Sequence, residues 1–312
     1  MLKVSFRAAI ASLCLMFPAA ASAGLLGSGL QFLEDNDFEA QVSGFQDGTL
    51  DPGDLLLATI EVQRRTPVLG TVDDLVNSST SAGPQTTYSS TTEAVTGVSL
   101  IRVDTLTYTP GSESATYTFE GASITEWANF GVTVSQDGVA AVLFADPPVA
   151  PGDPHIINSD GLPGLIGEVA SAAEGTVLGE FTPVFWQAIA ESDNTLIPGG
   201  DPRNILDVTD LTFKAGLNAI SGPFKSHNIL GDPDQWSGSP VVQLAQSQIF
   251  RDNGPVDLQL FGGLGTFSGG PGEFTLVTDT DLYINVVPEP TSFAIFGVMG
   301  LAGVGFRRRR RA

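Results

Sequence analysis

The chain has 312 residues, enough for one large domain or two small ones. It carries 35 acidic against 14 basic side chains, and half of the basic residues lie near the two ends. The stretch between the ends is therefore strongly acidic, which argues against nucleic acid as a partner, because such a surface repels phosphates. The single cysteine, Cys14, lies in a segment that we expect to be removed, so the mature body has no disulfide and no cysteine nucleophile.

The first 23 residues have the three parts of a secretory signal. Lys3 and Arg7 precede an apolar run, and Ala21-Ser22-Ala23 is the small-x-small pattern that signal peptidase accepts. The apolar run is shorter than the roughly 20 residues that a membrane span prefers. We therefore predict a signal peptide over residues 1–23, with Ala21 and Ala23 directing cleavage and signal peptidase as a partner.

Short β-like runs fill the body, which we place at residues 24–287. In chain order these runs cover residues 55–63, 95–103, 115–120, 130–134, 139–144, 177–189, 256–261 and 274–277, followed by an alternating run that ends at Val286. Asp137-Gly138 lies between two of them and is a hairpin turn signal. Residues 77–92, rich in Ser and Thr, indicate an exposed loop, and only residues 162–173 and 241–250 resemble short helices.

This pattern of many short strands and few helical periods favours an all-β sandwich or barrel. We expect a β-sandwich or a jelly-roll-like body with few short helices. The prediction adds a signal helix at the N-terminus and a single transmembrane helix near the C-terminus.

Acidic side chains gather in the N-terminal part of the body, where Gly48 and Gly53 permit tight turns. These side chains are Asp35, Asp37, Asp47, Asp51 and Asp54. Ca²⁺ prefers several oxygen ligands from such loops, so these residues are calcium candidates. Their spacing departs from the EF-hand loop, and solvated acidic turns remain the alternative. A second acidic group contains Asp201, Asp207 and Asp210.

The sequence contains no H-E-x-x-H zinc motif, no G-x-S-x-G nucleophile motif and no G-x-x-x-x-G-K-[ST] phosphate-binding loop. His155 and His227 are the only histidines, and both lie beside Pro, Gly and Asp turns. We therefore predict no catalytic residue, and no cofactor besides the calcium hypothesis. Trp127, Trp186 and Trp236 are candidates for stacking on a sugar ring. Trp186 lies in an apolar run and is expected in the core, and Trp236, in a loop-like stretch, is the first to test.

The last 25 residues combine three features. Pro288-Glu289-Pro290 comes first, an uncharged apolar run over residues 291–306 follows, and the chain then has Arg307, Arg308, Arg309, Arg310 and Arg311. As a helix the apolar run spans about 24 Å, and snorkelling arginines with local thinning of the bilayer accommodate the difference from a full span. The arginines keep this end in the cytoplasm, so the body lies on the far side, in agreement with the signal peptide.

Together these features resemble the PEP-CTERM sorting signal, a motif also labelled as an ice-binding protein C-terminal domain. The resemblance implies recognition by exosortase, a membrane cysteine enzyme of Gram-negative bacteria that make extracellular polysaccharide. It also implies transient contact with the inner membrane, removal of the tail over residues 288–312, and delivery to the cell surface or extracellular matrix.

Two functions remain open for the body. The first is a non-enzymatic surface or matrix protein that acts in adhesion, flocculation or association with extracellular polysaccharide. The second is a secreted hydrolase that carries the same sorting tail. A deep pocket with His155 or His227 beside a serine or a carboxylate would favour the hydrolase.

The signal assignment predicts that the mature protein begins at Gly24, because signal peptidase cuts after the small residue that closes the Ala21-Ser22-Ala23 pattern. N-terminal sequencing of material recovered from the cell surface should return Gly24 as the first residue. Recovery of a chain that still begins at Met1 would contradict the assignment.

Overall fold

The computed structural model describes residues 25–26, 29–41, 49–67, 86–87, 94–146, 165–204, 207–224, 256–267 and 276–287. Several predictions lie outside these residues and stay predictions: those on Ala21, Ala23, Asp47, His155, His227, Trp236, residues 241–250 and the whole tail from Pro288 to Arg311. Within the described residues, no helix has the length and hydropathy that a membrane span requires. The span predicted for residues 291–306 is not among them.

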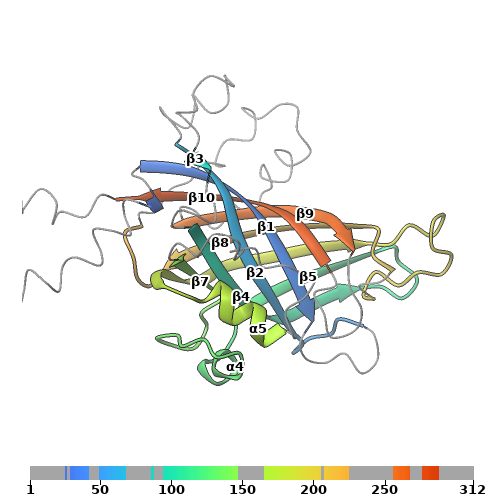
Figure 1. Cartoon of the computed structure of the whole chain (residues 1–312). Coiled ribbons are helices and arrows are strands. Elements are labelled where there is room, and N and C mark those ends of the chain that lie inside the picture. Colours follow the sequence, from blue (N-terminus) through green and yellow to red (C-terminus); the bar gives the residue numbers. More distant parts are fainter. Residues whose placement is uncertain are drawn as a thin grey trace, which may run out of the picture.

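Strands dominate the described part of the chain (Figure 1). They are β1 (Gly29–Gln41), β2 (Leu55–Pro67), β3 (Thr86–Thr87), β4 (Ala94–Tyr108), β5 (Ser114–Gly121), β6 (Ala141–Asp146), β7 (Thr176–Glu191), β8 (Asp210–Ala219), β9 (Leu258–Phe267) and β10 (Leu276–Val286). Two short helices, α4 (Ile124–Asn129) and α5 (Leu165–Ala172), accompany them. The prediction of an all-β protein with few short helices is confirmed.

The sheet closes on itself. Neighbouring strands follow the order β2-β1-β10-β9-β8-β7-β5-β4, and β4 then pairs with β2 from Leu55↔Arg102 to Val62↔Val95. Every one of these pairings is antiparallel. The result is a cylinder with eight strand positions, each hydrogen-bonded on both sides.

The expected sandwich or jelly roll is wrong for the described strands, because the long strands are shared between several partners. Along one edge β4 pairs with β2, and along the other it pairs with β6 through residues 94–99 and with β5 through residues 101–108. β7 likewise pairs with β6 near its start and with β5 near its end. β5 and β6 are therefore two halves of one strand position, and the described strands form one sheet rather than two.

Residues 122–140 interrupt this shared strand position and pack on the outside of the sheet. Ala122 and Val139 bridge the two ends of the insertion. Gly138 has a φ of 83°, as the Asp137-Gly138 turn signal predicts, but residues 130–134 form no strand. A capping box between Ser123 and Glu126 begins α4, and the buried Trp127 indole donates a hydrogen bond of 2.9 Å to the Val139 carbonyl.

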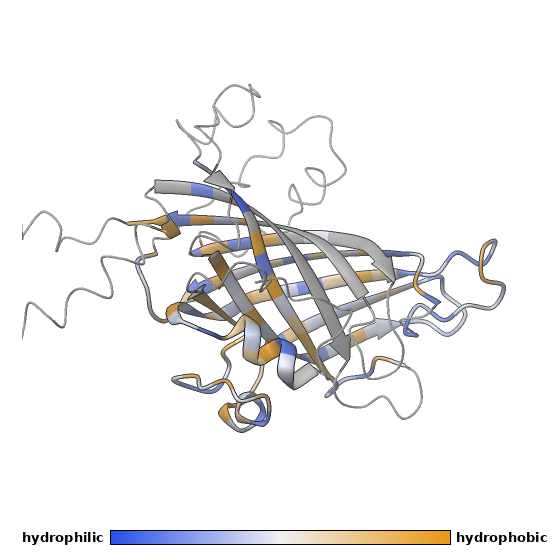
Figure 2. Ribbon diagram, viewed as in Figure 1, coloured by the Kyte–Doolittle hydropathy of each residue, from blue (hydrophilic) through white to orange (hydrophobic). Residues whose placement is uncertain are grey.

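Because successive side chains of a strand point to opposite faces, the strands build two hydrophobic cores, one on each face of the sheet. Figure 2 shows hydrophobic and hydrophilic residues interspersed along the strands. In β2, Leu56 and Ile60 belong to the core inside the cylinder, and Leu55 and Leu57 belong to the outer core. The outer core packs the sheet against Trp127 in the insertion and against residues of α5. The inner core encloses the cavity described below.

Trp127→Ala is expected to lower the free energy of unfolding by about 3–5 kcal/mol, because it removes a fully buried aromatic side chain from the outer core. Ile124→Ala in the same helix is the matched control, since Ile124 is 43% exposed, and its effect should stay below about 0.5 kcal/mol. Urea unfolding followed by circular dichroism measures both. Equal effects would contradict Trp127 as the anchor of the insertion.

Candidate functional site

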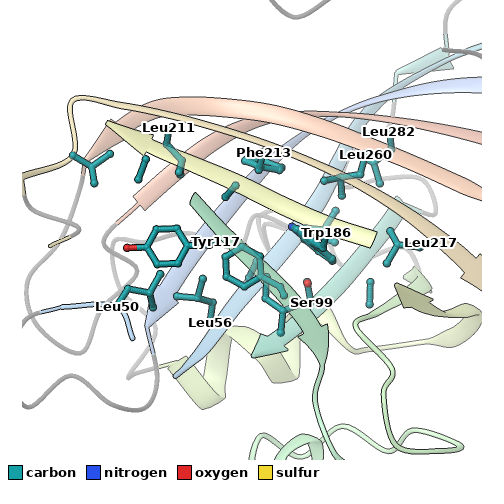
Figure 3. Close-up of a pocket in the computed structure, with 18 of the residues that line it drawn as sticks. Leu50, Leu56, Ser99, Tyr117, Trp186, Leu211, Phe213, Leu217, Leu260 and Leu282 are labelled. Atoms are coloured by element: carbon teal, nitrogen blue, oxygen red, sulfur yellow. The ribbon is translucent and has the colours of Figure 1, made fainter. Parts of the chain in front are cut away.

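A cavity of about 120 Å³ lies inside the closed sheet (Figure 3). An eight-stranded cylinder has an interior just wide enough to be filled by side chains or to hold one small ligand. Here small side chains at four inward positions leave room, namely Ala58, Ala141, Ala188 and Ala190. The lining is almost wholly hydrocarbon, and its polar side chains are those of Ser99, Tyr117, Trp186 and Arg203.

Aromatic rings form one wall of the cavity. Phe119 lies between Tyr117 and Trp186, with its centroid 6.2 Å from the Tyr117 ring and 6.5 Å from the Trp186 ring. The contact between Phe119 and Trp186 is edge-to-face, a favourable arrangement for aromatic quadrupoles. Trp186, which the sequence places in the core, therefore lines the cavity from β7.

The Tyr117 hydroxyl is a buried hydrogen-bond donor. The residue is 2% exposed, and among the described residues nothing accepts from or donates to its hydroxyl oxygen. Figure 3 shows this hydroxyl directed toward the end of the cavity at Leu50 and Leu211. By contrast, the Ser99 hydroxyl donates its proton to the Ala140 carbonyl at 2.9 Å, so Ser99 has no donor left for a molecule in the cavity.

Burial keeps Tyr117 protonated. Desolvation raises the pKa of its hydroxyl well above the ordinary value, the Arg203 charge opposes this, and nearby aspartates add to it. The side chain is therefore a neutral phenol that offers one O–H to the cavity.

Two loops meet at the Leu50 end of the cavity and are joined there by Arg203. The Leu50 amide donates to the Arg203 carbonyl at 2.9 Å, which ties the loop before β2 to the loop before β8. The Arg203 guanidinium donates to both Asp201 carboxylate oxygens, at 2.7 Å from Nη2 and 3.1 Å from Nε. Its carbon lies 4.7 Å from the centroid of the Tyr108 ring, and Asp51 is 3.9 Å away on the other loop.

This end of the cavity has an acidic balance. Among the described residues, the carboxylates of Asp51, Asp54 and Asp201 lie near the Arg203 guanidinium, and Asp201 engages it through paired hydrogen bonds. The Asp54 carboxylate accepts the Asp51 amide at 2.8 Å and so closes the turn into β2. An incoming anion would meet net repulsion here.

Of the calcium candidates, Asp51 and Asp54 lie in the turn before β2, whereas Asp35 and Asp37 lie on β1. Asp37 lies on β1 opposite Ile60, five residues along β2 from Leu55, which is about 17 Å of strand from the turn that holds Asp51 and Asp54. Asp35 lies two residues farther along. In the part of the chain that the structure describes, no three His, Cys, Asp or Glu side chains are placed to hold a metal ion. Calcium binding stays a prediction for all five candidates, Asp35, Asp37, Asp47, Asp51 and Asp54.

The second acidic group serves the fold. Asp201 pairs with Arg203, Asp207 accepts the Asp201 amide at 3.1 Å, and Asp210 begins β8 opposite Glu191. Neither Tyr117 nor Arg203 was expected from the sequence to be functional. The alternation of Tyr117 with Phe119 on one face of β5 predicts only that both side chains are buried.

The family comparison matches the end of the chain. The model described as the PEP-CTERM protein-sorting motif matches residues 286–310. The chain carries a PEP-CTERM sorting motif. This PEP-CTERM motif implies exosortase processing, export, and a location at the cell surface or outside the cell in Gram-negative bacteria. Comparison with curated proteins and with solved structures gave no match, so the role of the closed sheet rests on its own geometry.

Arg203→Met is expected to flatten the acid sensitivity of the fold. Hydrogen bonds from the Arg203 side chain lower the pKa of Asp201 below its ordinary value of 3.8, against the opposing effect of burial. A carboxylate whose pKa is depressed in the folded state stabilises the fold above about pH 4, and this contribution is lost as the pH falls through the folded pKa. Thermal unfolding between pH 2 and pH 6 should therefore show a steeper loss in the wild type than in Arg203→Met.

Asp201→Asn is the companion variant, because it removes the titrating group and keeps Arg203. Its profile should be flattened in the same pH range. If the melting temperature falls equally with pH in the wild type and in both variants, the Asp201–Arg203 pair does not stabilise the two loops.

Proposed function

We propose that the protein is a non-enzymatic surface or matrix protein that acts in adhesion, flocculation or association with extracellular polysaccharide. The observation that carries this proposal is the PEP-CTERM motif over residues 286–310, since exosortase processing delivers the body to the outside of the cell. The acidic body supports solubility there and disfavours close contact with anionic polymers. A neutral polysaccharide is therefore the preferred partner.

The charged pairs of the body support a structural role for their side chains. Arg102 bonds Glu126 in the insertion and lies 3.6 Å from Glu120 on the neighbouring strand. Glu180 on β7 accepts from the Ser135 hydroxyl, which ties the insertion to the sheet. In each case the carboxylate is engaged in holding the insertion against the sheet.

The experiment compares strains that lack the gene, carry the wild type, or carry a version with glutamine at Arg307 to Arg311. The arginines hold the tail end in the cytoplasm, so this version should escape processing and fail to reach the surface. Deletion should abolish surface attachment and flocculation, the wild type should restore them, and the tail variant should not. Arg64→Gln, which changes an exposed arginine of the body, is the matched control and should restore them fully.

Surface fractions analysed by immunoblot and intact mass separate sorting from function. Normal attachment by a strain without the gene would reject the adhesive role while leaving the sorting motif intact. Unchanged tail mass and location in the glutamine version would show that the arginines are not part of the signal. Release of sugars from polysaccharide by the purified protein would favour the hydrolase.

A further inference from the structure

We propose that the cavity inside the closed sheet binds a small neutral organic molecule with an apolar body and one oxygen that accepts a hydrogen bond from Tyr117. The proposal is independent of the adhesive role. It rests on the cavity, its lining and the Tyr117 hydroxyl, all of which belong to the described strands and loops.

The size and lining determine the apolar part of the ligand. Cavities of about 150 Å³ lined by Leu, Ile and Phe stay dry and bind benzene, and the present cavity of about 120 Å³ has the same kind of wall. It therefore fits one ring or a short alkyl chain. Desolvation of such a ligand against Phe213, Leu260 and the other apolar side chains supplies the affinity.

The Tyr117 hydroxyl determines the polar part. A buried donor without a partner is costly, so a ligand oxygen that accepts this proton removes a cost that the empty protein carries. Ser99 does not supply a second donor, because its proton is given to the Ala140 carbonyl. The cavity thus favours a ketone, aldehyde, ether or ester over a hydrocarbon.

The charges at the Leu50 end determine the net charge of the ligand. A carboxylate would meet Asp51, Asp54 and Asp201, while the guanidinium of Arg203 is occupied by Asp201. A cation would leave water for a lining that is almost wholly hydrocarbon, and two of the three carboxylates are already engaged, Asp54 by the Asp51 amide and Asp201 by Arg203. A neutral molecule avoids both penalties.

Three probes of similar size test the proposal: cyclohexanone, toluene and benzoate. Each is titrated into the purified full chain and followed by changes in amide NMR shifts, with dissociation constants taken from the titration curves. Cyclohexanone should bind most tightly, toluene more weakly, and benzoate not measurably. Shifts should concentrate on β5, β7 and β8, whose side chains line the cavity.

Tyr117→Phe keeps the ring and removes only the donor, so it should weaken cyclohexanone about fivefold and leave toluene unchanged. Tyr108→Phe is the matched control, because the Tyr108 hydroxyl accepts from the Gly111 amide on an exposed turn and Tyr108 does not line the cavity. It should leave both affinities unchanged. Ala188→Leu fills part of the cavity and should abolish binding of both neutral probes.

Equal affinity of cyclohexanone for the wild type and Tyr117→Phe would overturn the role of the hydroxyl. Benzoate as the tightest probe would overturn the neutral ligand. Absence of saturable binding by both neutral probes would overturn the site itself. If Ala188→Leu does not fold, the comparison of Tyr117→Phe with Tyr108→Phe still decides the proposal.

Discussion

The hydrogen bonds between β2 and β4 are the constraint on which the rest of the structure depends. They join Leu55–Val62 to Val95–Arg102 and turn an open antiparallel sheet into a cylinder. An open sheet exposes two rows of unpaired backbone groups that can recruit other chains, and closure removes them. It also gives every strand an inside and an outside, so that the same alternation produces the inner core and the outer core. A body without cysteine gains its stability from these two cores.

The insertion at residues 122–140 follows from closure. Because β5 ends at Gly121 and β6 begins at Ala141 in the same strand position, the chain between them must leave the cylinder and return to it. The return is so tight that a Cβ atom on Gly121 would lie 2.0 Å from the Gly138 carbonyl oxygen, which only glycine permits. Trp127 then covers the outer face of the sheet, and its indole bonds the bridge residue Val139.

Local patterns in the sequence predicted the strands that contain apolar or alternating runs, and missed β1, whose residues do not favour a strand. Alternation and β-branched content marked β2, β4, β5 and β7 within a few residues of their bounds. β1 was not expected, because Glu34 to Asp37 is a run of residues with low strand preference and was interpreted as turn sequence. Its hydrogen bonds to β2 and β10 override that preference. The pairing of β2 with β4, which closes the sheet, leaves no local pattern in the sequence, because 26 residues separate the two strands.

The cavity could not be predicted from the sequence either, because it forms where small side chains from β2, β6 and β7 meet inside the cylinder. Its energetics explain why it is better regarded as a site than as imperfect packing. At about 24 cal/mol per Å³, leaving a space of about 120 Å³ unfilled would cost about 3 kcal/mol, and leaving a buried hydroxyl unsatisfied would cost about 1–3 kcal/mol more. Phenylalanine at position 117 and a larger side chain at Ala188 or Ala190 would relieve both costs without altering the sheet. The two costs coincide in one place, and a small molecule with an accepting oxygen offsets both when it binds.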